Sequence, residues 1–275
     1  MGQGPTSLKG NTAQALISAS KGGDKETVRT LINQGTSPDI RDVDGKTLLM
    51  IASSYGHLGI VKVLVTKNAQ LDNADKHGVT PLIEGSANGH VGVVELLVQH
   101  GADINKADKD GWTPLMIGSK NGHGNVVELL VQHGADINKA NKDGWTPLMI
   151  GSQNGHVNVV ELLVQHGADI NKANKDGVAP LFIGSQNGHV GVVKLLVQHE
   201  ADVNKGMDYG VTPLMIGSLN GHVNVVELLV QHGADVNKGM DYGWTPLMIG
   251  SLNGHVNVVE LLVQHGADVN KADKN

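Results

Sequence analysis

The sequence contains no cysteine and very few aromatic side chains. None of its 275 residues is a cysteine, which excludes a disulfide framework and a cysteine-based zinc site. The lack of cysteine favours a reducing compartment, so we expect a cytoplasmic protein. Aromatic residues make up 3% of the chain, too few for a large globular core but enough for stacked aliphatic helices.

Long apolar runs are also missing. No stretch reaches the roughly 18 apolar residues of a membrane-spanning helix, so we expect no membrane span. The first residues, MGQGPTSLKG, lack the apolar segment of a secretory signal. They do fit the pattern for myristoylation of Gly2, which makes this glycine a candidate modification site.

Motifs for catalysis are absent too. The chain has no cysteine nucleophile, no Gly-x-Ser-x-Gly sequence and no glycine loop that could cradle a phosphate. Thirteen of its 14 histidines recur at a constant spacing in Gly-His and Gln-His pairs. Stacked helices would place the members of one series about 10 Å apart, too far to share an ion whose ligands lie about 2 Å away. We therefore predict a non-enzymatic protein with structural histidines and with no cofactor or metal.

The distribution of charge does not favour nucleic acid as a partner. The net charge is −6. Residues 1–76 carry nine basic and seven acidic side chains, whereas residues 77–275 carry twelve and twenty. A nucleic-acid-binding module would show a basic stripe. Lysines do recur from Lys106 to Lys271, but each follows an aspartate by three residues, which predicts a solvated surface and no nucleic-acid partner.

A period of 33 residues organises what is present. The sequence GWTPLMIGS occurs at 111–119, 144–152 and 243–251. Repetition at a fixed period of this length is typical of solenoids, in which each unit packs only on its neighbours. We divide the chain into an N-terminal tail (1–10), a capping repeat (11–43) and the repeats 44–76, 77–109, 110–142, 143–175, 176–208, 209–241 and 242–275.

Residues 143–175 illustrate what one repeat should form. Thr146 can cap a helix whose first turn holds Pro147, where a missing N–H costs little. Asn154-Gly155 should end this short helix. A second helix is indicated by VNVVELLVQH, whose apolar residues recur at helical spacing. Gly167 follows in the place of a left-handed C-cap, and a loop leads to the next repeat.

These residues resemble the ankyrin repeat family. The resemblance rests on DGWTPL (143–148), NGH (154–156), VVELLVQHGADIN (159–171) and their counterparts at every period, and it covers about residues 11–275. It implies an all-α solenoid of stacked helix-turn-helix units with projecting β-hairpin-like loops. It also implies protein binding through the loop tips and the adjoining face of the first helices.

The chain departs from the family pattern at several places. Glycine replaces the usual small alanine at Gly85, Gly118, Gly151, Gly184, Gly217 and Gly250, which should lower stability unless it permits closer helix contact. Repeat 176–208 has Ala179 for threonine and Glu200 for the capping glycine, so we predict that it is the weak joint of the array. Repeat 242–275 lacks the polar outer face of a terminal repeat. Either the array continues beyond this sequence or a partner covers that end.

Side chains that vary between otherwise similar repeats are the candidate partner-binding residues, because packing does not dictate them. Aromatic residues among them are typical of interface hot spots. The alternative is that each tryptophan stacks on a neighbouring loop. We predict that a partner protein contacts Trp112, Trp145, Trp244, Tyr209, Tyr242, Met207, Met240, Val79, Val178, Val211, Leu219, Leu252 and Lys120.

Two further readings stay open. The resemblance implies candidate sites of asparagine hydroxylation, each with a leucine eight residues earlier, at Asn105, Asn138, Asn171, Asn204, Asn237 and Asn270; the alternative is that these side chains only hold the loop.

The predicted function is a non-enzymatic interaction scaffold. The alternatives are an array that self-associates through its uncapped C-terminal repeat, or a recognition segment of a larger multidomain protein or effector.

Overall fold

The computed structural model describes residues 5–272, with side chains from residue 11 onward. The myristoylation candidate Gly2 lies outside the described residues. The chain forms two compact units, with the boundary between Asp136 and Ile137. We call the described residues up to Asp136 unit 1 and those from Ile137 unit 2.

Each unit is a series of short helix pairs. Unit 1 contains α1 (Pro5–Gly22), α2 (Lys25–Asn33), α3 (Leu48–Ser54), α4 (Leu58–Thr66), α5 (Pro81–Ala87), α6 (Val91–Gln99), α7 (Pro114–Lys120) and α8 (Gly124–Gln132). Unit 2 contains α9 (Pro147–Gln153), α10 (Val157–Gln165), α11 (Pro180–Gln186), α12 (Val190–Gln198), the 3-10 turn η1 (Asp208–Gly210), α13 (Pro213–Leu219), α14 (Val223–Gln231), α15 (Pro246–Leu252) and α16 (Val256–Gln264).

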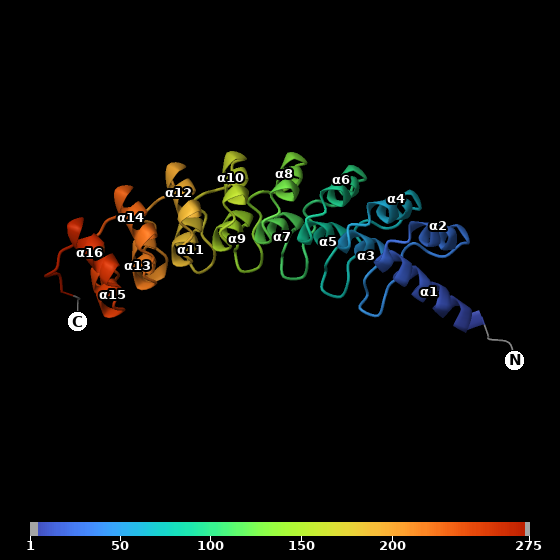
Figure 1. Cartoon of the computed structure of the whole chain (residues 1–275), viewed down its shortest axis with the longest axis horizontal. Helices are drawn as coiled ribbons and strands as arrows, with labels where there is room; N and C mark the ends of the chain where they lie inside the picture. The colour runs from blue at the N-terminus through green and yellow to red at the C-terminus, as the bar shows by residue number, and fades with distance from the viewer. Residues whose placement is uncertain (1–4, 273–275) are drawn as a thin grey trace. The chain divides into compact units, whose positions relative to one another are not determined.

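The helices of each unit form two layers. In unit 1 the first helices α3, α5 and α7 contact one another in turn, and so do the second helices α4, α6 and α8; unit 2 repeats this arrangement with α9–α16. Loops extend from the layer of first helices (Figure 1). The part of the chain from 5 to 272 contains no β-strand, and its one isolated β-bridge joins Arg41 to Thr47. The all-α fold predicted from the repeat is confirmed.

Local sequence explains where these helices begin and end. The hydroxyl of Thr146 accepts a hydrogen bond from the Met149 amide at 3.4 Å, and Pro147 occupies the first turn. The threonines at the equivalent positions of five other repeats make the same bond. Gly167 follows α10 with φ +87°, a conformation that costs glycine little.

Repeat 176–208 lacks two of these devices, as its sequence predicts. Ala179 begins α11 without a side-chain cap. Glu200 adopts φ +64°, where the other repeats of unit 2 place glycine. A long side chain in this region carries backbone strain. Whether the repeat is also the weak joint of the array stays a prediction.

The core lies between the two helix layers of each repeat. Val159, Val160 and Leu163 of α10 are fully buried, opposite Leu148 and Met149 of α9. Burial of one such side chain contributes roughly 1.5–3 kcal/mol to folding, and this contribution recurs in every repeat.

One aromatic residue belongs to this core rather than to a surface. Phe182 is 3% exposed. It occupies the position that Met149 and Met215 fill in neighbouring repeats, and both of these are fully buried. Packing therefore accounts for Phe182.

Histidine and asparagine side chains bind neighbouring repeats together within each unit. The Nε2 atom of His90 lies 3.0 Å from the carbonyl oxygen of Ser54, one repeat earlier, and His222 makes the equivalent contact with Gln186. The Gln-His histidines instead place Nδ1 2.8 Å from a carbonyl oxygen of their own helix, as His100 does with Leu96. The structural role predicted for these histidines is confirmed.

The recurring lysines are not a solvated series in unit 2, so that prediction was wrong. The ammonium groups of Lys172 and Lys238 donate to the main-chain carbonyls of Asn138 and Asn204 at 2.9 and 2.8 Å, one repeat earlier. Both lysines are half-buried. These ammonium groups therefore bind the backbone of the preceding loop.

The N-terminal helix is longer than the repeat boundary implied. It begins at Pro5, inside the segment expected as a tail, and its buried residues Leu16, Ile17 and Ala19 pack toward the following repeat. Proline suits the first turn of a helix because its missing N–H has no intrahelical partner there.

Candidate partner-binding surface

The loops before the first helices are closed by backbone hydrogen bonds. We call the five residues before each capping position a finger. In every finger the first amide donates to the carbonyl of the fifth residue at 2.9–3.0 Å, for example from Asn141 to Trp145. The seven fingers are 42–46, 75–79, 108–112, 141–145, 174–178, 207–211 and 240–244.

A side chain also closes five of the fingers. The first residue is Asp or Asn, and its Oδ1 accepts the amides of the third and fifth finger residues. In finger 174–178, Asn174 Oδ1 lies 3.0 Å from the Asp176 nitrogen and 2.9 Å from the Val178 nitrogen. The same pair of bonds forms at Asp42, Asp75, Asp108 and Asn141. Such side-chain turns hold the backbone in one conformation.

Fingers 207–211 and 240–244 do not have this acceptor. Their first residues are Met207 and Met240, and a thioether is at best a weak hydrogen-bond acceptor. The preceding residue also changes, from alanine to Gly206 and Gly239. Both changes remove restraints on the backbone.

Side chains predicted to bind a partner contact each other in unit 1. The Lys120 ammonium lies 5.2 Å from the ring centroid of Trp112, a cation–π distance. Trp112 and Val79 are half-buried, while Lys120 is exposed. This contact also shows that the fifth position of a finger and the last residue of the following first helix share one face of the repeat.

An ion pair that sequence reasoning missed lies in the same unit. Lys46 Nζ is 2.6 Å from Glu84 Oε1, and the two side chains are 36% and 12% exposed. Burial lowers the pKa of Lys46, but the hydrogen bond and charge of Glu84 raise it by more, so the pKa lies above the usual value. The other repeats hold isoleucine where Glu84 stands, at Ile117 for instance. The glutamate at this position was therefore the signal in the sequence that could have revealed the ion pair.

Exposed apolar side chains gather in the last two repeats of unit 2. Tyr209 and Tyr242 are 64% and 58% exposed, and Leu219 and Leu252 are 40% and 72% exposed. The predicted residues Trp145, Val178, Val211, Trp244, Met207 and Met240 are half-buried. The tryptophans are therefore only partly available, and the tyrosines and leucines offer more apolar surface to a partner.

The candidate hydroxylation sites have a structural role. Asn204 Oδ1 accepts the amide of Asp235 at 2.9 Å, and its Nδ2 donates to the carbonyl of Gly233 at 3.2 Å. Asn105, Asn138, Asn171 and Asn237 accept the amide of the aspartate in the following repeat in the same way. Hydroxylation of Asn105, Asn138, Asn171, Asn204, Asn237 and Asn270 stays a prediction.

Apolar residues of the last repeat are more exposed than the equivalent residues of the repeat before it. Val256 and Val263 are 62% and 44% exposed, whereas Val223 and Val230, their counterparts one repeat earlier, are half-buried. The two repeats have the same helix sequence. The difference follows from position in the stack.

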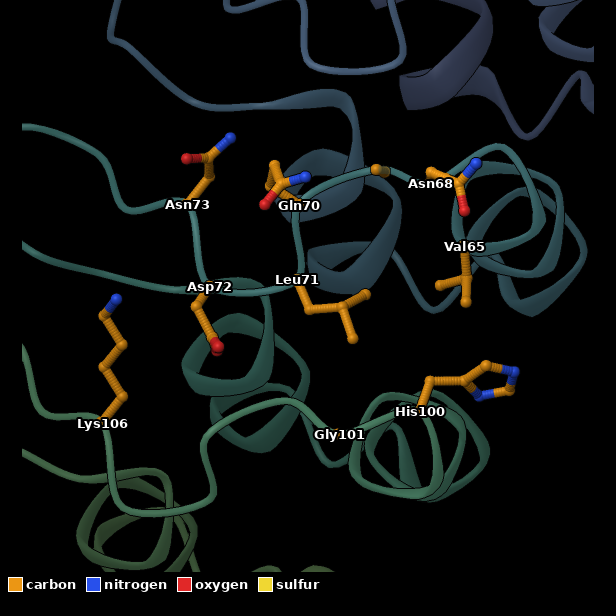
Figure 2. A pocket seen from close by; sticks show the side chains of 10 residues that line it. Val65, Asn68, Gln70, Leu71, Asp72, Asn73, His100, Gly101 and Lys106 are labelled. Atoms are coloured by element: carbon orange, nitrogen blue, oxygen red, sulfur yellow. The ribbon is translucent and has the colours of Figure 1, made fainter.

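A polar hollow of about 640 Å³ lies in unit 1, where α4 and α6 end. Figure 2 shows Val65, Leu71 and His100 around one part of it and Asp72 and Lys106 around another. The carboxylate of Asp72 accepts the amide of Asp103 at 3.0 Å, and the His100 ring contacts the Leu96 carbonyl. These groups hold the repeats together, and we assign no ligand to the hollow.

Comparison with protein families identifies the repeat. A model described as ankyrin repeats (3 copies) matches residues 16–108, 105–174 and 181–273, and one described as ankyrin repeats (many copies) matches residues 158–197. The chain belongs to the ankyrin repeat family. No curated protein matches the sequence of this ankyrin-repeat protein.

Membership of the family bears on function at a general level. Ankyrin repeats are protein-interaction modules and are typically non-enzymatic. Within residues 5–272, none of the helices of this ankyrin-repeat protein has both the length and the apolar character needed to cross a bilayer.

Proposed function

We propose that this ankyrin-repeat protein is a non-enzymatic scaffold that binds a protein partner through its fingers and the adjoining first helices. The single observation that carries the proposal is the exposure of Tyr209, Tyr242, Leu219 and Leu252 in unit 2. Tyrosine is enriched at interface hot spots, and clustered apolar surface marks interaction sites.

The variation between repeats supports the same surface. Residues 205–237 and 238–270 are identical except for Val211 and Trp244. Both belong to fingers and both are half-buried. Duplicated repeats have thus diverged at a finger position while their core stayed the same.

Affinity capture with matched variants tests the proposal. The bait is the whole chain, in a lysate of the cells that make it, and bound proteins are quantified by mass spectrometry. The finger variant carries Tyr209→Ser, Tyr242→Ser and Leu252→Ser. The control carries Glu227→Ala and Glu260→Ala, which change exposed residues of α14 and α16 in the same two repeats.

We expect the finger variant to lose bound proteins that the control retains, with both variants folded by circular dichroism. Removing a few hot-spot side chains of about 2 kcal/mol each would lower affinity by more than tenfold. Equal capture by wild type and finger variant would contradict the proposal.

Self-association is a second candidate function, favoured by the exposed Val256 and Val263 of the last repeat. Its test is the mass of the protein at increasing concentration, by light scattering. A Val256→Lys, Val263→Lys variant should then remain monomeric at concentrations where the wild type associates. A mass independent of concentration would reject this candidate.

A further inference from the structure

The last two fingers combine loosened backbones with exposed apolar side chains. Met207 and Met240 replace the Asp or Asn that accepts two amides in each of the other fingers. Each of these two fingers therefore lacks two hydrogen bonds that hold the other fingers in one conformation. Departures from a local rule are expected mainly at functional sites.

The two fingers also differ in conformation although both read Gly-Met-Asp-Tyr-Gly. Tyr209 has φ +62° within η1, whereas φ of Tyr242 is not positive. The left-handed conformation is unfavourable for a residue other than glycine. One sequence therefore takes two turn conformations in neighbouring repeats, as an adaptable loop would.

The fingers lie side by side. The amide of Asp241 donates to the carbonyl of Tyr209 at 3.1 Å. Leu219 and Leu252 occupy the position of Lys120, which reaches the ring of Trp112 in unit 1. By repeat equivalence they lie on the same face as the fifth residues of their fingers.

The charge at these fingertips is acidic. Finger 174–178 carries Lys175 next to Asp176, but the same two positions hold Asp208-Tyr209 and Asp241-Tyr242 in the last fingers. Asp208 and Asp241 are exposed. Lys238, two residues before finger 240–244, donates to the Asn204 carbonyl. An apolar surface edged by carboxylates results.

We propose that fingers 207–211 and 240–244 dock a partner segment in which apolar side chains stand next to lysine or arginine. The apolar groups pack on the tyrosines and leucines, and the cations face Asp208 and Asp241. The fingers adjust their turns to the segment as it binds. This inference rests on the proposed function, since it names the partner chemistry for the same surface.

A library of random 16-residue peptides displayed on phage is the probe, panned on the whole chain. We expect enriched peptides to combine lysine or arginine with leucine, isoleucine or aromatic residues. Their affinity should fall about tenfold in an Asp208→Lys, Asp241→Lys variant, as for close charge pairs at an interface. A control variant with Asp143→Lys and Asp176→Lys makes the same charge change at other exposed fingertips of unit 2 and should bind as the wild type does.

The outcomes separate this inference from the proposed function. Peptides that bind both charge variants equally, but lose binding to a Tyr209→Ser, Tyr242→Ser variant, would overturn the basic partner and leave the finger surface standing. Peptides indifferent to every finger substitution would overturn both proposals, and so would the absence of any enriched peptide.

Amide hydrogen exchange tests the loosened turns independently. The amides of Tyr209 and Val211 should exchange at least about fivefold faster than those of Asp176 and Val178, which Asn174 holds, if the lost bonds are worth about 1 kcal/mol. A Met207→Asn variant should slow the exchange at Tyr209 and Val211. Equal exchange in the two fingers would refute the loosening.

Discussion

Replacing Gly217 by alanine should stabilise this protein. Gly217 lies inside the seven-residue helix α13 and is buried. A Cβ added there would lie 3.5 Å from Val225 Cγ1 and 3.5 Å from Val226 Cγ2, which are ordinary van der Waals distances. Ala52 already fills the same position in repeat 44–76 and is fully buried.

Two contributions set the expected size of the effect. Alanine is favoured over glycine within a helix by about 0.8–1.0 kcal/mol. The new methyl group is buried against two valines, which adds up to about 0.8 kcal/mol. We therefore expect Gly217→Ala to raise the free energy of unfolding by about 1–2 kcal/mol. Gly151→Ala should gain less, because its Cβ would lie 3.3 Å from Val159 Cγ1.

Equilibrium unfolding in urea, followed by circular dichroism, measures the change. The denaturant slope must match the wild type, since repeat arrays can lose two-state behaviour. Gly233→Ala is the matched control: it has φ +87° and no neighbour within 4 Å of the added Cβ, so the same change should destabilise by about 1 kcal/mol. A Gly217→Ala variant less stable than wild type would refute the packing argument.

Three further changes follow from the same geometry. Ala179→Thr should add the missing cap of α11 and about 1 kcal/mol to the free energy of unfolding, measured in urea. Glu200→Gly relieves φ +64° and should add up to about 1 kcal/mol; loss of stability would contradict the strain. The raised pKa of Lys46 beside Glu84 means that their ion pair stabilises the fold at pH 8 and is lost as pH rises above the usual lysine value of 10.5. Glu84→Gln should therefore lower the free energy of unfolding by up to about 1 kcal/mol at pH 8. At a pH well above 10.5 the same substitution should leave it unchanged. Urea unfolding at these two pH values measures the difference.

The repeated sequence was enough to predict the helix pairs and their caps. Thr146, Pro147 and Gly167 act through rules that involve only neighbouring residues, and the structure confirms each of them. The strain at Glu200 was predictable for the same reason, because six of the other seven repeats have glycine at this position.

Contacts between repeats were harder to predict. The lysine at position 238 looked solvated because its partner, the Asn204 carbonyl, is a backbone group one repeat away that no side-chain pattern reveals. The burial of Phe182 was easier to predict, because its alignment with Met149 was a sufficient signal for the core.

The candidate surface was predicted only in outline. Variation between repeats pointed to the fingers, but it could not separate the half-buried Trp244 from the exposed Tyr242. That difference depends on how each finger turns. The change from Asn174 to Met207 was visible in the sequence, but its meaning required the two amide hydrogen bonds that Asn174 accepts.

Site-specific photo-crosslinking identifies which residues of this protein touch a partner. A photoreactive amino acid replaces Tyr242 in one variant, Gln231 on the exposed side of α14 in a second, and Val256 in a third. We expect crosslinks to a partner protein from position 242 and none from position 231. Crosslinks to a second copy from position 256 alone would favour self-association, and crosslinks to a partner only from position 231 would contradict the account.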